Sequence, residues 1–174
     1  MTADLKIVDV QTTTFRYRSR VGRDEEGHAH PAPEHDATQT LLRVRTSAGV
    51  DGHCFGASPE TAAVAKRLIG GLHPLDRERI WSRLRQAQRL ERRALDDGNL
   101  SVVDQALWDV AGQMTGLPVS KLLGGFRDKV PAYASTMCGD DIPGGLDSPE
   151  AYAEFAAACM SRGYAALKLH TCSP

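Results

Sequence analysis

The chain has 174 residues, of which 41% are hydrophobic and 25% are charged, and its formal net charge at pH 7 is −1. This composition is that of an ordinary folded protein with one sizeable core, which excludes a chain that is disordered throughout. The near balance of charge provides no overall field that would attract nucleic acid or an anionic membrane, so we expect neither as a partner.

The apolar runs fall short of the roughly 18 residues that a membrane helix needs, and the start, MTADLKIVDVQTTTF, lacks the apolar stretch of a signal peptide. We therefore expect a cytoplasmic protein. Its cysteines lack the C-x-x-C spacing of a zinc or redox site and are too few for a disulfide scaffold. We expect free, mostly buried thiols at all four positions, Cys54, Cys138, Cys159 and Cys172.

The first third of the chain predicts an antiparallel meander. Residues 5–17 alternate in part between apolar and polar side chains, which is typical of a half-buried strand. Residues 18–36 are rich in Gly, Pro, His and charged residues, so we expect a mobile loop there. Residues 39–56, QTLLRVRTSAGVDGHCFG, then predict a second strand, a glycine-containing turn and a third strand.

Two helices are expected next. Ser58 followed by Pro59 is a strong helix start, because the serine oxygen caps free N–H groups and proline at the first helical position loses no needed donor. That helix should end at Gly70. A second helix should begin near Asp76, with an apolar stripe that buries Ile80, Trp81, Leu84 and Ala87.

The third helix has the clearest pattern. Apolar residues recur at helical spacing, and Ser101-x-x-Asp104 resembles a capping box at its start. Gly116 and Pro118 should end it. The apolar positions are Val103, Ala106, Leu107, Val110, Ala111 and Met114.

The architecture changes near Arg127. VPAYASTM predicts a buried strand, SPEAYAEFAAACMSRG a capped helix and YAALKLH another buried strand. Two strands that are joined by a crossover helix run parallel. We therefore predict two domains, an α+β unit over residues 1–127 and the beginning of an α/β barrel over residues 128–174. A closed barrel needs about 250 residues, so these residues form only a part of one.

These segments carry a resemblance to a known family. SVVDQALWDVAGQMTGLPVSKLLGG, followed by RDKVPAYAST, resembles the boundary between cap and barrel in mandelate racemase and muconate lactonizing enzymes of the enolase superfamily. LIGGLHPLDRERIW resembles the cap helices of that family, and GYAALKLH its second barrel strand. The resemblance implies an α+β capping domain, with a three-stranded antiparallel meander plus helices, followed by the first β/α units of an incomplete TIM-type barrel.

The resemblance also implies a chemistry. The family binds one Mg²⁺, which stabilises the enediolate formed when a base removes the proton next to a substrate carboxylate. Its metal ligands are acidic residues on the third, fourth and fifth barrel strands, so we expect Mg²⁺ as a cofactor but no ligand within these residues. The implied activity is that of an acid-sugar dehydratase, with a racemase, epimerase or cycloisomerase as the alternative.

The implied catalytic residues are Lys168 and His170. The family's second barrel strand ends in Lys-x-Lys, and alternation along a strand puts both side chains on one face. Lys168 matches the first lysine, which lies near the substrate carboxylate. His170 replaces the lysine that acts as base; its ordinary pKa of about 6.5 suits that role, although its reach is shorter. Alternatively, His170 orients substrate or protonates a leaving hydroxyl, or both residues merely end a strand.

Four further residues are candidates for substrate binding. In the family, two cap loops, here near residues 18–36 and 50–57, close over the barrel mouth, which implies that His28, His30 and His53 form hydrogen bonds with a polyhydroxy acid. Asp140 follows the first barrel strand, on the face where barrel chemistry occurs. The alternatives are plain solvent exposure for the histidines, a weak H-x-H-x4-H metal cluster, and a turn for Asp140.

Seven arginines between residues 77 and 93 surround one amphipathic helix and are partly offset by Glu78 and Glu91. We interpret them as a surface that faces solvent or another subunit, and we expect a homo-oligomer. The partner implied for the site is a small carboxylate, a sugar acid. A rival hypothesis is a non-catalytic interaction module that consists of the cap alone; under the enzyme hypothesis, the 174-residue chain by itself should be inactive.

Overall fold

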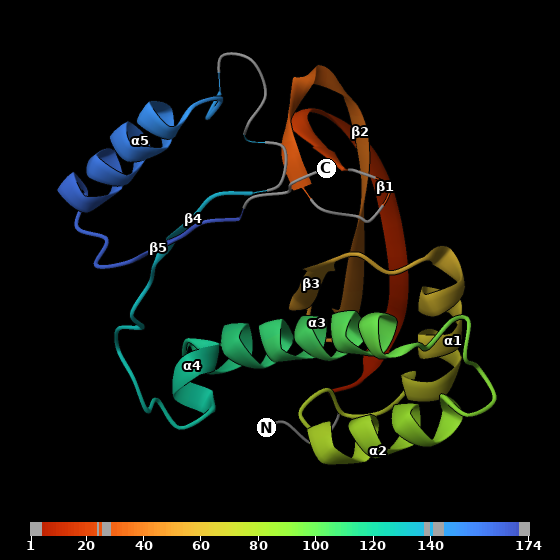
Figure 1. Ribbon diagram of the computed structural model, residues 1–174. Coiled ribbons are helices and arrows are strands. Elements are labelled where there is room, and N and C mark those ends of the chain that lie inside the picture. The colour runs from red at the N-terminus through yellow and green to blue at the C-terminus, as the bar shows by residue number, and fades with distance from the viewer. Residues whose placement is uncertain (1–4, 24, 26–28, 138–139, 141–144, 171–174) are drawn as a thin grey trace. The chain divides into compact units, whose positions relative to one another are not determined.

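The computed structural model describes residues 5–23, 25, 29–137, 140 and 145–170, with the side chain of His30 excepted (Figure 1). The chain divides into two compact units, Met1–Arg16 with Thr38–Phe126, and Tyr17–Ala37 with Arg127–Pro174. We describe each unit by itself, and the predicted domain boundary after residue 127 stays a prediction. Within the described residues, every helix is too short or too polar to cross a membrane.

The N-terminal half contains the predicted meander. The sheet has the order β1 (Ile7–Arg23), β2 (Ala29–Thr46) and β3 (Asp51–Phe55). β2 and β3 are antiparallel, with Leu41 opposite Phe55 at one end and Arg45 opposite Asp51 at the other. β1 and β2 extend well beyond β3 as a long two-stranded ribbon (Figure 1).

The prediction of a loop over residues 18–36 is wrong, because β1 continues to Arg23 and β2 begins at Ala29. Cross-strand ion pairs hold this part of the ribbon. The guanidinium of Arg18 donates to Glu34 at 3.0 Å and to Asp36 at 2.7 Å, and that of Arg20 donates to Glu34 at 3.4 Å. Composition suggested a loop, but charges that repeat every second residue place opposite signs across from each other on two strands.

The first two helices begin as predicted. In α1 (Pro59–Ile69), the Ser58 hydroxyl accepts a hydrogen bond from the N–H of Thr61 at 3.1 Å, and Gly70 ends the helix. α2 (Arg77–Ala87) buries Ile80 and Leu84. Trp81 does not belong to the buried stripe, since it is 39% exposed. Ile80 and Leu84 alone form the buried stripe of this 11-residue helix, and the Trp81 indole lies outside that stripe.

α3 (Asp97–Thr115) starts earlier than predicted. Its N-cap is Asp96, whose carboxylate accepts from the N–H of Asn99 at 2.7 Å, and the Ser101 hydroxyl instead accepts from the Gln105 side chain. The predicted capping box is therefore wrong, because burial of Leu100 adds a first turn to the helix. Gly116, with a φ of 67°, ends it as predicted.

The core of the cap lies where the sheet meets the helices. β3 packs closely on α3: a Cβ at Gly52 would lie 1.9 Å from the carbonyl oxygen of Ala106, so only glycine fits. The cluster of buried residues draws on all three helices and the base of the sheet. Its largest members are Ile7, Leu42, Ile69, Ile80, Leu84, Leu95, Leu100 and Leu107.

The C-terminal part contains a parallel β/α unit. After the short α4 (Val119–Leu122), β4 (Ala134–Ser135) and β5 (Leu167–Lys168) pair in parallel, with α5 (Pro149–Ser161) between them in the chain. The fold-class prediction, an α+β cap followed by the start of a TIM-type barrel, is confirmed.

The two barrel strands are shorter and more exposed than the predicted buried strands. Tyr133 and Leu169 are each 57% exposed. A parallel strand is buried only when other strands and helices flank it, and in the described part of the chain β4 and β5 pair only with each other.

The thiols of Cys54 and Cys159 are free, the second buried and the first half-buried. Burial raises the pKa of the Cys54 thiol. Cys138 and Cys172 lie outside the described residues.

Candidate active site

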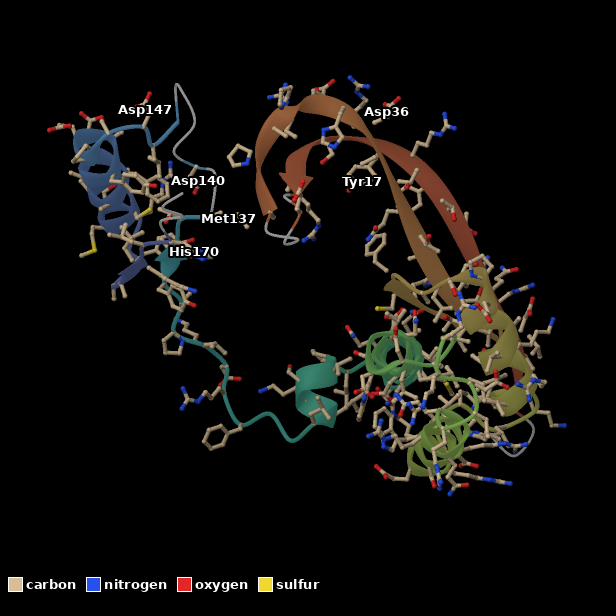
Figure 2. All side chains as sticks on the ribbon, turned by 45° about the vertical axis from the view of Figure 1, so that its right-hand side comes forward. Tyr17, Asp36, Met137, Asp140, Asp147 and His170 are labelled. Carbon is tan, nitrogen blue, oxygen red and sulfur yellow. The ribbon has the colours of Figure 1, made fainter. Side chains whose placement is uncertain are left out.

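The residues predicted to be catalytic lie at the end of β5. The N–H of Thr136 donates to the carbonyl oxygen of Lys168 at 3.0 Å, and the N–H of His170 donates to the Thr136 hydroxyl at 2.7 Å. Thr136 is buried. Through its backbone and its side chain, Thr136 keeps the chain extended from β5 to His170. Figure 2 labels His170 beside the strands.

Lys168 and His170 are two residues apart on this extended segment, a spacing that puts both side chains on one face. Lys168 is exposed and His170 is half-buried. The ammonium of Lys168 has no ion-pair partner among the described residues, so its charge is available to an anion. The roles of both residues stay a prediction.

Asp140 takes part in a turn. Its carboxylate accepts a hydrogen bond from the N–H of Met137 at 2.6 Å, and its carbonyl oxygen accepts from the N–H of Leu146 at 2.6 Å (Figure 2). The sequence left open whether this residue contacts substrate or shapes the loop. The contacts show that it shapes the loop, and one carboxylate oxygen has no bond in the described residues. The neighbouring Asp141 lies outside the described residues.

Of the three histidines in the first predicted loop, the structure describes only the side chain of His35. His28 lies outside the described residues, as does the side chain of His30, which belongs to β2. The third member of the proposed H-x-H-x4-H cluster, His35, has its Nδ1 3.0 Å from the carbonyl oxygen of Pro33.

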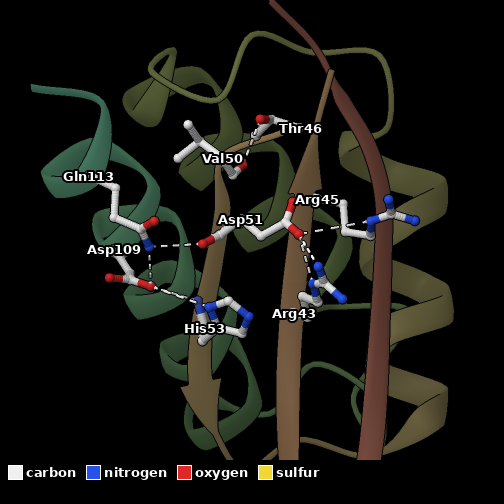
Figure 3. A network of polar contacts seen from close by, with 8 residues as sticks. All are labelled: Arg43, Arg45, Thr46, Val50, Asp51, His53, Asp109 and Gln113. Carbon is white, nitrogen blue, oxygen red and sulfur yellow. Dashed lines mark hydrogen bonds and ion pairs between the residues drawn. The ribbon is translucent and has the colours of Figure 1, made fainter. Parts of the chain in front are cut away.

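His53 lies on β3, the predicted third strand, which occupies most of the segment 50–57 that the resemblance implied to be a cap loop. Its N–H donates to the carboxylate of Asp109 at 2.9 Å, and its Nδ1 is 3.7 Å from the same oxygen. Gln113 donates to Asp109 at 2.9 Å and to the carbonyl oxygen of Asp51 at 2.8 Å (Figure 3). α3 thus holds the backbone of His53 through the Asp109 carboxylate, a contact that the sequence analysis missed.

The same network reaches β2. The Arg43 guanidinium donates to the carboxylate of Asp51 at 2.8 Å through Nε, and Arg45 lies 4.0 Å from that carboxylate (Figure 3). The Thr46 hydroxyl closes the β2–β3 turn by donating to the carbonyl oxygen of Val50 at 2.6 Å. The signal that would have found the network is the i, i+4 pair Asp109 and Gln113 on the polar edge of α3.

A second contact that the sequence did not predict joins α2 to α3. The Arg77 guanidinium lies 3.8 Å above the ring of Trp108 and forms an ion pair with Asp104. Burial lowers the pKa of Arg77 and raises the pKa of the Asp104 carboxyl, so for both groups desolvation outweighs their mutual attraction. This stacked ion pair joins α2 to α3.

Within residues 5–23, 25, 29–137, 140 and 145–170, the His, Cys, Asp and Glu side chains nowhere form a group of three or more that would hold a metal ion. The described donor set therefore does not fit Mg²⁺, and none of the contacts above depends on one.

The fold is that of an α+β cap followed by the start of a TIM-type barrel, with a lysine and a histidine at the end of the second parallel strand. Residues 28–124 match the N-terminal domain of the mandelate racemase / muconate lactonizing enzyme family. The chain belongs to this family, as the resemblance had predicted.

The chain is also similar to individual proteins of known name. A crystal structure of D-glucarate dehydratase from Agrobacterium tumefaciens, complexed with magnesium, is 47% identical, covers 97% of this chain and superposes with a TM-score of 0.86. A D-galactonate dehydratase family member from Pseudarthrobacter chlorophenolicus is 32% identical over 142 residues, or 76% of this chain. A D-galactarolactone cycloisomerase from Agrobacterium fabrum is 40% identical over 89 residues, or 48% of this chain.

The chain spans less than half the length of these relatives: it covers 45% of the glucarate dehydratase, 33% of the galactonate dehydratase family member and 24% of the cycloisomerase.

Proposed function

We propose that this chain supplies the capping domain and first β/α unit of an acid-sugar dehydratase of the mandelate racemase type. The observation that carries the proposal is the 47% identity, over 97% of this chain, to a D-glucarate dehydratase. The substrate class would then be a sugar acid, a small carboxylate.

The proposed reaction begins at the carbon next to the substrate carboxylate. His170 takes the proton from that carbon, and the electron pair moves into the carboxylate to give an enediolate. Collapse of the enediolate then expels the β-hydroxyl, which takes a proton from the protonated His170 and leaves as water. The resulting enol tautomerises to the 2-keto acid. The Lys168 ammonium, without an ion-pair partner among the described residues, favours both the substrate carboxylate and the enediolate electrostatically.

The proposed cofactor is Mg²⁺, because the similar glucarate dehydratase is complexed with magnesium. Bound beside the carboxylate, the cation would supply positive charge for the enediolate oxygens. Its ligands are expected from barrel strands that follow β5, outside this chain.

His28, His30, His53 and Asp140 remain our candidates for substrate contacts. His53 has the best-described setting, because its backbone N–H bonds to Asp109 and its ring is 40% exposed beside that carboxylate. The exposed part of the imidazole can form a hydrogen bond with a hydroxyl group.

A second candidate is an isomerase, which the 40% identity to a D-galactarolactone cycloisomerase favours over part of the chain. Racemisation, epimerisation and cycloisomerisation share the enediolate but retain every oxygen atom. Products therefore separate the two candidates: a dehydratase forms a 2-keto acid with loss of water, whereas a racemase or epimerase forms the inverted stereoisomer with exchange of the α-proton for solvent deuterium.

The test uses the full-length protein that contains this chain, incubated in D₂O with Mg²⁺ and a library of acid sugars. We expect a 2-keto product, with Lys168→Met and His170→Asn each lowering kcat by about 10²–10⁴-fold. Lys129→Met, at an exposed lysine outside β5, is the matched control and should leave kcat unchanged. Absence of both keto product and deuterium exchange across the library would contradict the dehydratase and the racemase proposals.

A further inference from the structure

The most basic surface of the cap is hollowed. A cavity of about 380 Å³ lies at the end of α2 and in the turn that leads to α3, lined by Arg85, Gln88, Arg89, Arg92, Asp96 and Asp97. A second cavity of about 570 Å³ shares three of these residues and adds Trp81, Ser82 and Gln86. We call the first cavity the arginine hollow.

The two acidic residues of the arginine hollow are already engaged. The Asp97 carboxylate accepts from Arg85 at 2.8 Å and from Gln88 at 2.7 Å. The Asp96 carboxylate caps α3 through the N–H of Asn99. Arg85 neutralises Asp97, whereas Asp96 keeps its charge, so the two remaining arginines of the hollow leave its lining with a net positive charge.

Arg89 and Arg92 are those remaining arginines. Within the described residues, neither has an ion-pair or hydrogen-bond partner, although both line the same cavity. Guanidinium groups that converge without an anion between them repel each other, and their planar forks suit the oxygens of carboxylate and phosphate groups. The region from residue 77 to 93 also contains no lysine, which would hold such groups only as a point charge.

The hollow favours a compact ligand. Asp96 and Asp97 line it on the α3 side and would repel the continuing charges of a nucleic acid or a long acidic segment. A single group with two or three negative charges presents less charge to these carboxylates than a polyanion does.

We propose that the arginine hollow is a binding site for a compact multivalent anion, either a phosphate group or a di- or tricarboxylate. Arg89 and Arg92 provide the bidentate donors, and Arg85, held by Asp97, forms the far wall. This site is separate from the residues proposed for dehydration, and it does not depend on that proposal.

The test measures binding of inorganic phosphate and, separately, of citrate to the full-length protein by isothermal titration calorimetry and thermal unfolding, at constant ionic strength. We expect one site per chain, a raised unfolding midpoint, and weaker binding as salt increases. Arg89→Gln and Arg92→Gln should each weaken binding at least tenfold without lowering the unfolding midpoint of the ligand-free protein, because both side chains are exposed.

Arg83→Gln is the matched control. Arg83 is an exposed arginine of α2 that does not line the hollow and has no ion-pair partner among the described residues. Its loss removes the same charge and should leave binding within twofold. If phosphate binds more tightly than citrate, the site prefers phosphate groups; if citrate binds more tightly, it prefers di- or tricarboxylates. Stabilisation no greater than that by chloride at equal ionic strength, or equal weakening by Arg83→Gln, would overturn the proposal.

Discussion

The cap and the β4–α5–β5 unit bury their side chains very differently. In the cap, residues of the sheet and of all three helices reach complete burial, with Leu42, Ile69, Leu84 and Val110 at 0% exposure. From Arg127 onward, only Thr136 and Cys159 are buried among the described residues. An antiparallel sheet covered by helices closes a core by itself, whereas a parallel pair depends on neighbours on both faces.

This difference predicts where stability resides. The cap should unfold as a cooperative body, and the β4–α5–β5 unit should add little to its free energy of unfolding in this chain. Because both tryptophans, Trp81 and Trp108, belong to cap helices, tryptophan fluorescence reports on the cap. The following predictions test or refine the comparison, from the largest expected effect to the smallest.

Truncating one leucine in each region should give the greatest contrast. Leu84→Ala, at 0% exposure, should lower the free energy of unfolding by about 2–5 kcal/mol, because it leaves a cavity in the core. Leu169→Ala, at 57% exposure, should cost less than about 0.5 kcal/mol. Urea unfolding followed by fluorescence and by far-UV circular dichroism measures both. Equal costs would mean that β5 is as well packed as α2.

Adding one methyl group where β3 meets α3 should have the next largest effect. Gly52→Ala should destabilise the cap by about 1–3 kcal/mol or more, because its Cβ would overlap the carbonyl oxygen of Ala106. Gly98→Ala is the control, since its Cβ would meet only the Asp96 carboxylate at 3.4 Å within a helix. It should be neutral or stabilising by up to about 1 kcal/mol. A tolerated Gly52→Ala would show that the two elements can separate.

The ion pair between Arg77 of α2 and Asp104 of α3 should contribute to the stability of the cap. Asp104→Ala should cost about 1–3 kcal/mol because Arg77 loses its acceptor, whereas Asp104→Asn keeps an acceptor and should be close to neutral at pH 7. Burial raises the pKa of Asp104, so its favourable contribution is complete below the ordinary value of 3.8 and is lost as the pH rises through the folded value. The stability of Asp104→Asn relative to wild type should therefore rise with pH above 3.8. Urea unfolding between pH 3 and pH 7 checks the slope, and the opposite slope would contradict the burial argument.

The smallest effect is expected in the ribbon. Arg18→Gln removes the ion pairs with Glu34 and Asp36 on an exposed surface, where salt screens such pairs strongly. Amide hydrogen exchange in residues 17–23 should accelerate only a few-fold, and the difference should vanish in 1 M NaCl. The unfolding of the cap should not change. A loss of cap stability would show that the ribbon contributes to the core.

The helices and the parallel unit could be predicted because their signals are local. Ser58-Pro59, the apolar spacing of α3 and the turn at Gly116 each act within a few residues. The ribbon could not be predicted from composition, because its pairing places arginines of one strand opposite carboxylates of another. The exposure of Trp81 and the start of α3 depended on which residues the core finally covers.

Less of the candidate site could be predicted. The position of Lys168 and His170 followed from strand alternation and from the family resemblance, but their roles depend on a substrate and on groups outside this chain. The turn at Asp140 and the contact between His53 and Asp109 arise from loop geometry and from packing of β3 on α3. A single sequence does not encode either in a local pattern.

The ribbon has a repeating pattern of charge, with Arg16, Arg18 and Arg20 on one strand and Glu34 and Asp36 on the other. The base of β1 is tied to another part of the cap, because the backbone of Ile7 bonds to Gly71 and Leu72. Inserting one dipeptide into each strand would therefore lengthen the ribbon while keeping opposite charges face to face. Evolution can extend or shorten this arm of the protein without redesigning the domain that carries it.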